Sequence, residues 1–137
     1  MEYSTPNKEY HPDHAIVYGC QYHLVFCPKY RRKVLTPEQQ VRFKELVDEK
    51  QDENGYQELG MEVMTDHVHL LLDVDPRQGI HQVVGRIKGY TAHALRREYP
   101  WLKSRLPSLW TRSKFISTVG SVSLGEVQEY IEEQKGR

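Results

Sequence analysis

The stretch TDHVHLLLDV, residues 65–74, constrains the fold most, because its apolar residues recur at every second position, as they do in a β-strand. Successive side chains of a strand point to opposite faces of the sheet. One face of this strand would carry only apolar residues and must be the core face: Val68, Leu70 and Leu72. His67 and His69 would lie together on the opposite face.

Segments on both sides of this strand predict the remaining elements. YQELGMEVM (56–64) is typical of a strand, and only Thr65 and Asp66 separate it from the next one. The other elements are expected to be a strand in 15–27, a helix over 36–55, a helix in 76–100, a strand over 114–119 and a helix over 123–137. Residues 101–113 are expected to be irregular or to form a short helix. The order strand, helix, strand, strand, helix, strand, helix predicts an α+β fold of the ferredoxin-like kind. It would have an antiparallel sheet with helices on one face and an additional C-terminal helix.

Two of the predicted helices carry recognisable end signals. Thr36 is placed to cap the first helix, with Pro37 in its first position and Gly55 just past its end. The apolar face of that helix is expected to consist of Val41, Phe43, Leu46 and Val47. In the last helix, Ser123 and Glu126 have the spacing of a capping box.

The length of 137 residues predicts one domain, over residues 16–137, with a loose N-terminal tail over residues 1–15. No apolar run approaches the ~20 residues that span a bilayer. The N-terminus lacks a basic segment followed by an apolar one, so we expect a cytoplasmic protein. Cys20 and Cys27 lie seven residues apart in one extended segment, so their side chains point to opposite faces. They are therefore expected to be reduced and not to bridge each other.

The charges are unevenly distributed although the formal net charge is zero. KYRRK (29–33) holds four cations in five residues, and residues 86–114 hold eight cations against one acid, Glu98. Such asymmetry can place a basic, nucleic-acid-binding surface on a neutral protein. The alternative is a set of solvated helix faces that happen to be basic.

The two histidines at positions 67 and 69 would be about 7 Å apart at their Cα atoms. Two imidazoles at that spacing can converge on one cation, although a metal site would need a further protein ligand. Structural histidines on a half-exposed sheet face explain the pair equally well.

The last predicted helix carries Tyr130 and Gln134 at positions i and i+4, so they share a face. Val127 and Ile131 form a neighbouring apolar stripe that could dock the helix. Tyr130 therefore lies at the border of the docked face, where a phenol could be a packing residue or a nucleophile.

Four blocks together resemble a known family: YHLVFCPKYRRKVL, MEVMTDHVHLLL, LWTRSKFISTVG and VQEYIEEQ. In this order and spacing they are similar to the small single-tyrosine HUH transposases of bacterial and archaeal insertion sequences. The resemblance extends from about Tyr18 to the C-terminus. One departure is Thr65, where proline would be expected before Asp66.

The resemblance implies an enzyme that cleaves and rejoins single-stranded DNA at insertion-sequence ends through a 5′-phosphotyrosine. By that resemblance Tyr130 is the nucleophile, and His67, His69 and Gln134 bind Mg²⁺ or Mn²⁺. Glu62 and Asp66 would support an imidazole, or Glu62 would be a further ligand. The partners implied are subterminal DNA hairpins and a second copy of the chain in a homodimer, with no membrane and no small-molecule cofactor. In relatives the tyrosine helix can serve the partner's histidines.

Basic and aromatic residues would provide the DNA contacts. The candidates are Lys29, Tyr30, Arg31, Arg32, Lys33, Arg86, Lys88 and Arg112. Tyr90 and Trp110 could also stack on bases, but Trp110 is better explained as a core anchor beside Phe115.

Several other functions remain open on the sequence alone. A non-catalytic module that binds single-stranded or hairpin DNA would keep the fold without the chemistry. A related HUH nuclease acting on genomic palindromes would differ mainly in substrate. Relaxases and replication initiators share the histidine pair but are generally larger, and an RNA-binding domain of related topology would need no tyrosine–glutamine helix.

Overall fold

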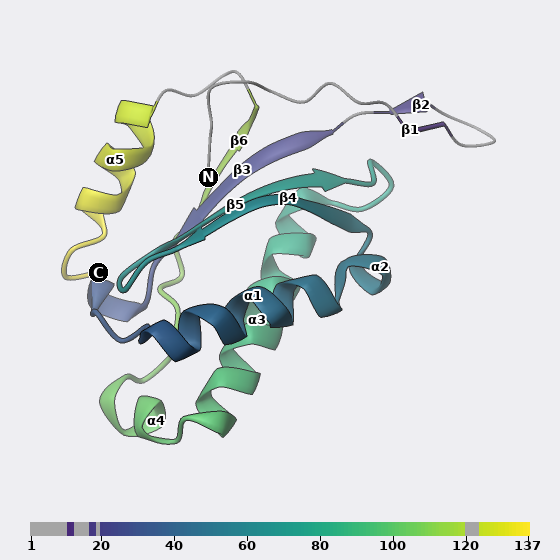
Figure 1. The fold of residues 1–137 in the computed structure, drawn as a ribbon. Coiled ribbons are helices and arrows are strands. Elements are labelled where there is room, and N and C mark those ends of the chain that lie inside the picture. The colour runs from purple at the N-terminus through teal and green to yellow at the C-terminus, as the bar shows by residue number, and fades with distance from the viewer. Residues whose placement is uncertain (1–10, 13–16, 19, 120–123) are drawn as a thin grey trace.

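The computed structural model describes residues 11–12, 17–18, 20–119 and 124–137 (Figure 1). Most of the predicted N-terminal tail and the capping residue Ser123 lie outside the described residues. Near the N-terminus, β1 (His11–Pro12) pairs antiparallel with β2 (Val17–Tyr18). Within the described chain, no helix is long and apolar enough to span a membrane.

The main sheet has four strands in the order β4-β5-β3-β6. They are β3 (Gln21–Phe26), β4 (Tyr56–Val63), β5 (Val68–Val74) and β6 (Phe115–Thr118). All three neighbouring pairs are antiparallel. This confirms the predicted α+β class, and the strand order is that of a ferredoxin-like sheet.

The helices lie on the two sides of this sheet. They are α1 (Pro37–Glu49), α2 (Gln51–Asn54), α3 (Ile80–Glu98), α4 (Trp101–Arg105) and α5 (Leu124–Glu133), with a short 3-10 turn, η1 (Lys29–Arg31). In Figure 1, α1 and α3 cover one face of the sheet and α5 lies across the other. The C-terminal helix is thus separated from the main helical layer by the sheet.

The ends of the α1–α2 segment follow the predicted signals. The Thr36 side chain accepts a hydrogen bond from the Gln39 backbone, and the Gln39 side chain accepts one from the Thr36 backbone. Gly55 ends α2 with φ of 71°, a conformation that glycine adopts without a steric cost. One prediction about α1 was wrong, because Val41 is 61% exposed. It lies about 200° around the helix from the buried Phe43 at 100° per residue.

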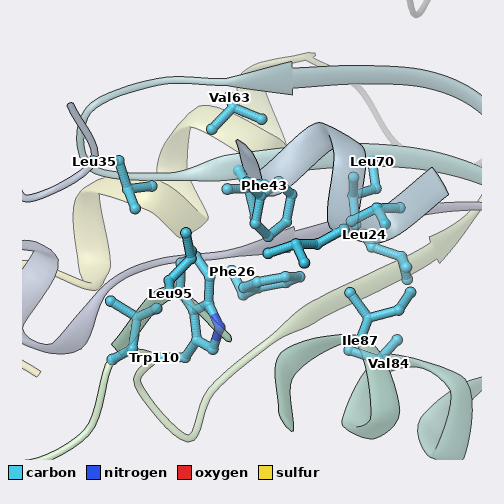
Figure 2. Close-up of a cluster of buried hydrophobic side chains, with 14 of the residues drawn as sticks. Leu24, Phe26, Leu35, Phe43, Val63, Leu70, Val84, Ile87, Leu95 and Trp110 are labelled. Atoms are coloured by element: carbon cyan, nitrogen blue, oxygen red, sulfur yellow. The ribbon is translucent and has the colours of Figure 1, made fainter. Parts of the chain in front are cut away.

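The core fills the space between the sheet and α1 and α3 (Figure 2). Its centre is a cluster of three rings in edge-to-face contact, with 4.8 Å between the centroids of Phe26 and Trp110 and 5.7 Å between those of Phe43 and Trp110. Trp110 is therefore a core anchor, as predicted. Its aromatic neighbours in the core are Phe26 and Phe43, whereas Phe115 is half-buried on β6.

Both cysteines are free thiols, as predicted. Cys27 is fully buried at the end of β3, and this burial raises the pKa of its thiol to about 12. It is therefore a neutral, unreactive packing residue.

Replacing Phe43 by alanine should lower the free energy of unfolding by about 3–5 kcal/mol, because it opens a cavity beside Trp110 and Phe26. Urea titrations followed by circular dichroism measure this loss. The matched control is Val41→Ala on the exposed side of the same helix, which should change stability by less than about 0.5 kcal/mol. Equal losses in the two variants would contradict the core assigned to this face of α1.

Candidate active site

The β4–β5 hairpin holds the histidine pair on the sheet face away from the core. The register pairs Val63 with Val68 and Glu62 with His69, so each pair shares a face. Val63 and Val68 are buried in the core, which leaves Glu62 and His69 on the opposite side. The register shifts by one residue between Glu58 and Gly60, as at a β-bulge. After this shift Glu62 faces the histidine side of the sheet and Val63 faces the core.

A pocket of about 470 Å³ lies between this hairpin and α5. Its lining residues are Glu62, Met64, His67 and His69 from the hairpin and Val127, Gln128, Ile131 and Glu132 from α5. The structure therefore brings the predicted histidine pair together at one pocket. The apolar stripe of Val127 and Ile131 faces the histidines, which is the docking role predicted for it.

The ring of His67 is held by the residue before it. Its Nδ1 lies 2.9 Å from Oδ1 of Asp66. A hydrogen bond of this kind fixes the orientation and tautomer of an imidazole and leaves Nε2 as the nitrogen that could bind a metal. The predicted supporting role of Asp66 toward an imidazole is thus matched by a direct contact.

The ring of His69 contacts a third histidine that the sequence analysis missed. His23 on β3 places its Nδ1 3.1 Å from Nε2 of His69, and both side chains are buried. The two positions are 46 residues apart, so only the pairing of β3 with β5 brings them together. The sequence signal that could have revealed His23 is a histidine among the apolar residues of a predicted strand.

The environment keeps these two imidazoles neutral. Burial lowers the pKa of His23. Burial, followed by the neighbouring rings of His23 and His67, lowers the pKa of His69 to about 3. Both rings are therefore uncharged near neutral pH, the state in which an imidazole can bind a metal ion.

Tyr130 lies on α5 but is not among the residues that line the pocket. Its hydroxyl is 2.8 Å from the Ser113 hydroxyl, and its ring centroid is 5.4 Å from that of Phe115. Burial raises the pKa of Tyr130 to about 12, an effect that the Ser113 hydrogen bond partly offsets. In this conformation the phenol is protonated and directed toward the β6 side of the helix.

Gln134 is 2% exposed, although the sequence alone would have placed it on the surface. Its Nε2 is 3.4 Å from the Tyr130 carbonyl oxygen, and its buried Oε1 has no hydrogen-bond partner among the described residues. A buried amide oxygen without a partner is a costly feature that a cation would satisfy.

The donor types therefore fit a divalent ion held by two imidazoles and one amide oxygen. Within the described residues, no group of three or more His, Cys, Asp and Glu side chains is placed to hold a metal. The predicted set of His67, His69 and Gln134 contains only two residues of those types. The observation that favours it is the unpartnered oxygen of Gln134, which is not itself among the residues that line the histidine pocket.

The candidate DNA-contact residues divide into two groups. Tyr30, Arg32, Lys33, Arg86 and Arg112 are exposed, and Lys29 lies over the Tyr30 ring with its ammonium 5.2 Å from the centroid. Arg31 is paired with Asp66 and Glu132, with only 12% of its side chain exposed.

Lys88, another of those candidates, donates from its ammonium to three carbonyl oxygens of the segment before β6: those of Thr111, Arg112 and Ser113. Burial, followed by the nearby Lys114, lowers the pKa of Lys88 to about 8. In the described conformation this side chain holds the segment that carries Ser113, the hydrogen-bond partner of Tyr130.

Comparison with known proteins decides the family. Residues 16–134 match the protein family described as Transposase IS200 like. The chain belongs to this IS200-like transposase family. This confirms the resemblance of the four sequence blocks, and the family assigns DNA cleavage and strand transfer during transposition of insertion sequences.

Similar proteins agree with this assignment. The IS200-like transposase is 41% identical over 120 residues to the ISDra2 transposase TnpA of Deinococcus radiodurans, covering 86% of each chain. It is 29% identical over 119 residues to the transposase of insertion sequence IS200 of Salmonella typhimurium, covering 85% of this chain and 78% of that one.

Two solved structures share the fold of this IS200-like transposase. A crystal structure of a protein from Deinococcus radiodurans R1, assigned as a transposase, superposes with a TM-score of 0.85 at 33% identity and covers 93% of this chain and 99% of that one. A REP-associated tyrosine transposase bound to a REP hairpin superposes with a TM-score of 0.57 at 12% identity, covering 94% of this chain and 68% of that one. At that identity the second structure shows the fold alone.

The neutral imidazoles should make the metal-free protein sensitive to mild acid. The pKa of His69 is lower in the folded chain than in the unfolded chain, where it is about 6.5. Between these values the unfolded chain binds more protons, so stability is lost as pH falls through this window. Unfolding by urea in EDTA should show a loss of up to about 1.4 kcal/mol per pH unit per titrating histidine below about pH 6.5.

His69→Gln should flatten this pH dependence, whereas His81→Gln, at an exposed position of α3, should keep it. The comparison uses the slope, so a general loss of stability in His69→Gln does not affect it. An unchanged slope in His69→Gln would contradict the burial of a neutral imidazole at this position.

Proposed function

We propose that this transposase cleaves and rejoins single-stranded DNA at insertion-sequence ends, with Tyr130 as the nucleophile and a divalent metal held by His67, His69 and Gln134. One observation carries the proposal. His67 and His69 open onto a single pocket, and the opposite wall of that pocket is the helix α5, which bears Tyr130 and ends one residue before Gln134. The family match supports the same chemistry at the level of DNA cleavage and strand transfer.

The proposed chemistry at Tyr130 is a balanced exchange of phosphodiester bonds. The phenol loses its proton and its oxygen attacks the scissile phosphorus, while the bond to the 3′-oxygen breaks and that oxygen takes up a proton. The products are a 5′-phosphotyrosine and a free 3′-hydroxyl. A second 3′-hydroxyl can then displace Tyr130, which regains its proton, and strands are rejoined without an external energy source.

The bound metal would polarise the scissile phosphate and offset its developing charge. The chain supplies the geometry: Asp66 orients His67, and His23 contacts His69. Mg²⁺ and Mn²⁺ both suit this set, and the two nitrogen donors favour Mn²⁺ somewhat more than an all-oxygen site would.

Tyr130 must leave its contact with Ser113 before it can attack. Because Tyr130 does not line the pocket of its own histidines, the proposal includes a homodimer in which α5 of one copy can serve the histidines of the other.

The proposed DNA partners are single-stranded DNA and subterminal hairpins. Exposed cations would bind the phosphates, among them Arg32, Lys33, Arg86 and Arg112. A further basic pocket of about 330 Å³ lies where α3 meets α4, lined by Ala92, His93, Arg96, Arg97 and Lys103. The structural neighbour described above was solved with a REP hairpin, which is in keeping with this class of partner.

Tyr130→Phe should abolish covalent attachment of labelled single-stranded DNA to the protein, because the phenol oxygen is the proposed nucleophile. The assay uses 5′- and 3′-labelled DNA from the element's ends, with and without Mg²⁺ or Mn²⁺, on a denaturing gel. The control is Tyr99→Phe at the end of α3, which removes a hydroxyl on the other side of the sheet and should keep full attachment.

The outcomes separate the proposal from its alternatives. Attachment that needs both Tyr130 and metal supports the proposal. If wild type and Tyr130→Phe bind the hairpin equally and neither cleaves, the chain is a binding module. Cleavage of genomic palindromes in preference to element ends would indicate the related nuclease.

Neutralising the basic α3–α4 pocket should weaken hairpin binding through lost phosphate contacts. In Arg97→Gln/Lys103→Gln, the slope of log affinity against log salt concentration should become less steep by about two. Fluorescence anisotropy with labelled hairpin DNA measures this. Arg77→Gln is the control, because Arg77 is already paired with Asp75 at 2.7 Å, and it should leave the slope unchanged. An unchanged slope in the double variant would remove this pocket from the DNA-binding surface.

A further inference from the structure

The turn η1 holds two residues in an unusual backbone conformation. Tyr30 and Arg31 have φ angles of 61° and 52°, in the left-handed region that non-glycine residues rarely adopt. Each costs about 1–2 kcal/mol and persists only where the surrounding structure enforces it. Two backbone hydrogen bonds to distant segments hold the turn in this conformation. Lys29 N donates to the Leu109 carbonyl and Tyr30 N donates to the Arg137 carbonyl, both at 2.8 Å.

This strained turn directs Arg31 into a junction between three elements. Its Nη1 donates to Glu132 Oε2 at 2.8 Å and to the Ile131 carbonyl at 3.2 Å, both on α5. Its Nε lies 3.4 Å from Oδ2 of Asp66 in the β4–β5 connection. The planar guanidinium suits this arrangement because its donors point in fixed, different directions.

Asp66 extends the connection to the pocket. While its Oδ2 faces Arg31, its Oδ1 is hydrogen-bonded to Nδ1 of His67. Only 15% of the Asp66 side chain and 12% of the Arg31 side chain are exposed, so water competes weakly for these contacts. A continuous path of polar contacts therefore runs from α5 through Arg31 and Asp66 to His67.

We propose that Arg31 is a positioning residue that couples the docking of the tyrosine helix α5 to the orientation of His67. When α5 is docked, Arg31 is held by Glu132 and the Ile131 carbonyl and in turn holds Asp66 against the His67 ring. When α5 moves away, Arg31 loses both helix contacts, and the restraint on Asp66 and His67 is relaxed. The role of His67 as a metal ligand rests on the proposed function; the coupling itself rests on the contacts above.

This role differs from a contact to DNA phosphate. To reach a phosphate, the Arg31 guanidinium would have to move away from Asp66. The partly buried Asp66 carboxylate would then lack its cationic partner, which is unfavourable. The neighbouring Arg32 and Lys33 are exposed and can bind phosphate without such a loss.

The test measures both ends of the path without DNA. Hydrogen exchange reports the docking of α5, and Mn²⁺ affinity, from the electron paramagnetic resonance of free Mn²⁺, reports the His67 side. Arg31→Gln and Arg31→Lys should each speed amide exchange in the last turns of α5 and weaken Mn²⁺ binding on the order of tenfold. Lysine at position 31 should not restore either property, because one ammonium cannot bridge Glu132, the Ile131 carbonyl and Asp66 at once.

Single-arm variants separate the two halves of the junction. Glu132→Gln should speed exchange in α5 with a smaller effect on Mn²⁺, and Asp66→Asn should weaken Mn²⁺ binding with little effect on α5. Arg31→Gln/Asp66→Asn should bind Mn²⁺ no more weakly than Asp66→Asn alone, because Arg31 acts on His67 through Asp66. Arg42→Gln is the matched control, since Arg42 also joins carboxylates of two helices but lies on α1. It should change neither readout.

Wild-type exchange and wild-type Mn²⁺ affinity in Arg31→Gln would overturn the inference. Failure of the wild-type protein to bind Mn²⁺ would instead overturn the proposed metal site. The coupling would then be decided by the ¹⁵N resonances of the His67 ring. A change in these resonances in both Arg31→Gln and Glu132→Gln supports the coupling, and unchanged resonances in both overturn it.

Discussion

The two-residue period of β5 is the constraint on which the site depends. Val68, Leu70 and Leu72 are anchored in the core by contact with the helical layer, and this burial fixes which way every other residue of the strand faces. The histidines cannot turn inward without moving those side chains into water. The hydrophobic core therefore determines the direction of the imidazoles, and local polar contacts with Asp66 and His23 refine their rotation.

The sheet face that carries the histidines is covered less extensively than the core face. α5 covers the histidine pocket with a narrow apolar stripe, and much of its attachment is polar, through Arg31 and the C-terminal backbone. Such contacts are individually modest, whereas the aromatic cluster under the sheet is densely packed. A rigid platform for the histidines and a more easily displaced helix for the tyrosine are suited to the proposed reaction, in which Tyr130 would leave Ser113.

The sequence predicted the parts of the fold that depend on local patterns. The four strands, the α1 cap at Thr36 and the left-handed Gly55 all follow from signals within a few residues. The histidine pair followed from strand periodicity, whereas the roles of Tyr130 and Gln134 came from the family resemblance. What the sequence could not predict are contacts across large separations. His23 meets His69 only through strand pairing, and Arg31 meets Glu132 across 101 residues. Val41 was misplaced because an apolar residue on a helix need not lie on its buried face.

The bulge in β4 has a consequence for how this chain can change in length. Before the bulge, Tyr56 faces the core; after it, Met61 and Val63 do, so the inward positions change from even to odd numbers. The extra residue, Leu59, absorbs that change of phase. Strict alternation through all the residues of β4, with Leu59 kept and no bulge, would instead turn Glu62 toward the core and Val63 toward the histidines. Loss of Leu59 alone would give a regular ladder and leave Glu62 and Val63 on their present faces, so β4 can lose this one residue without turning the side chains beside the histidines.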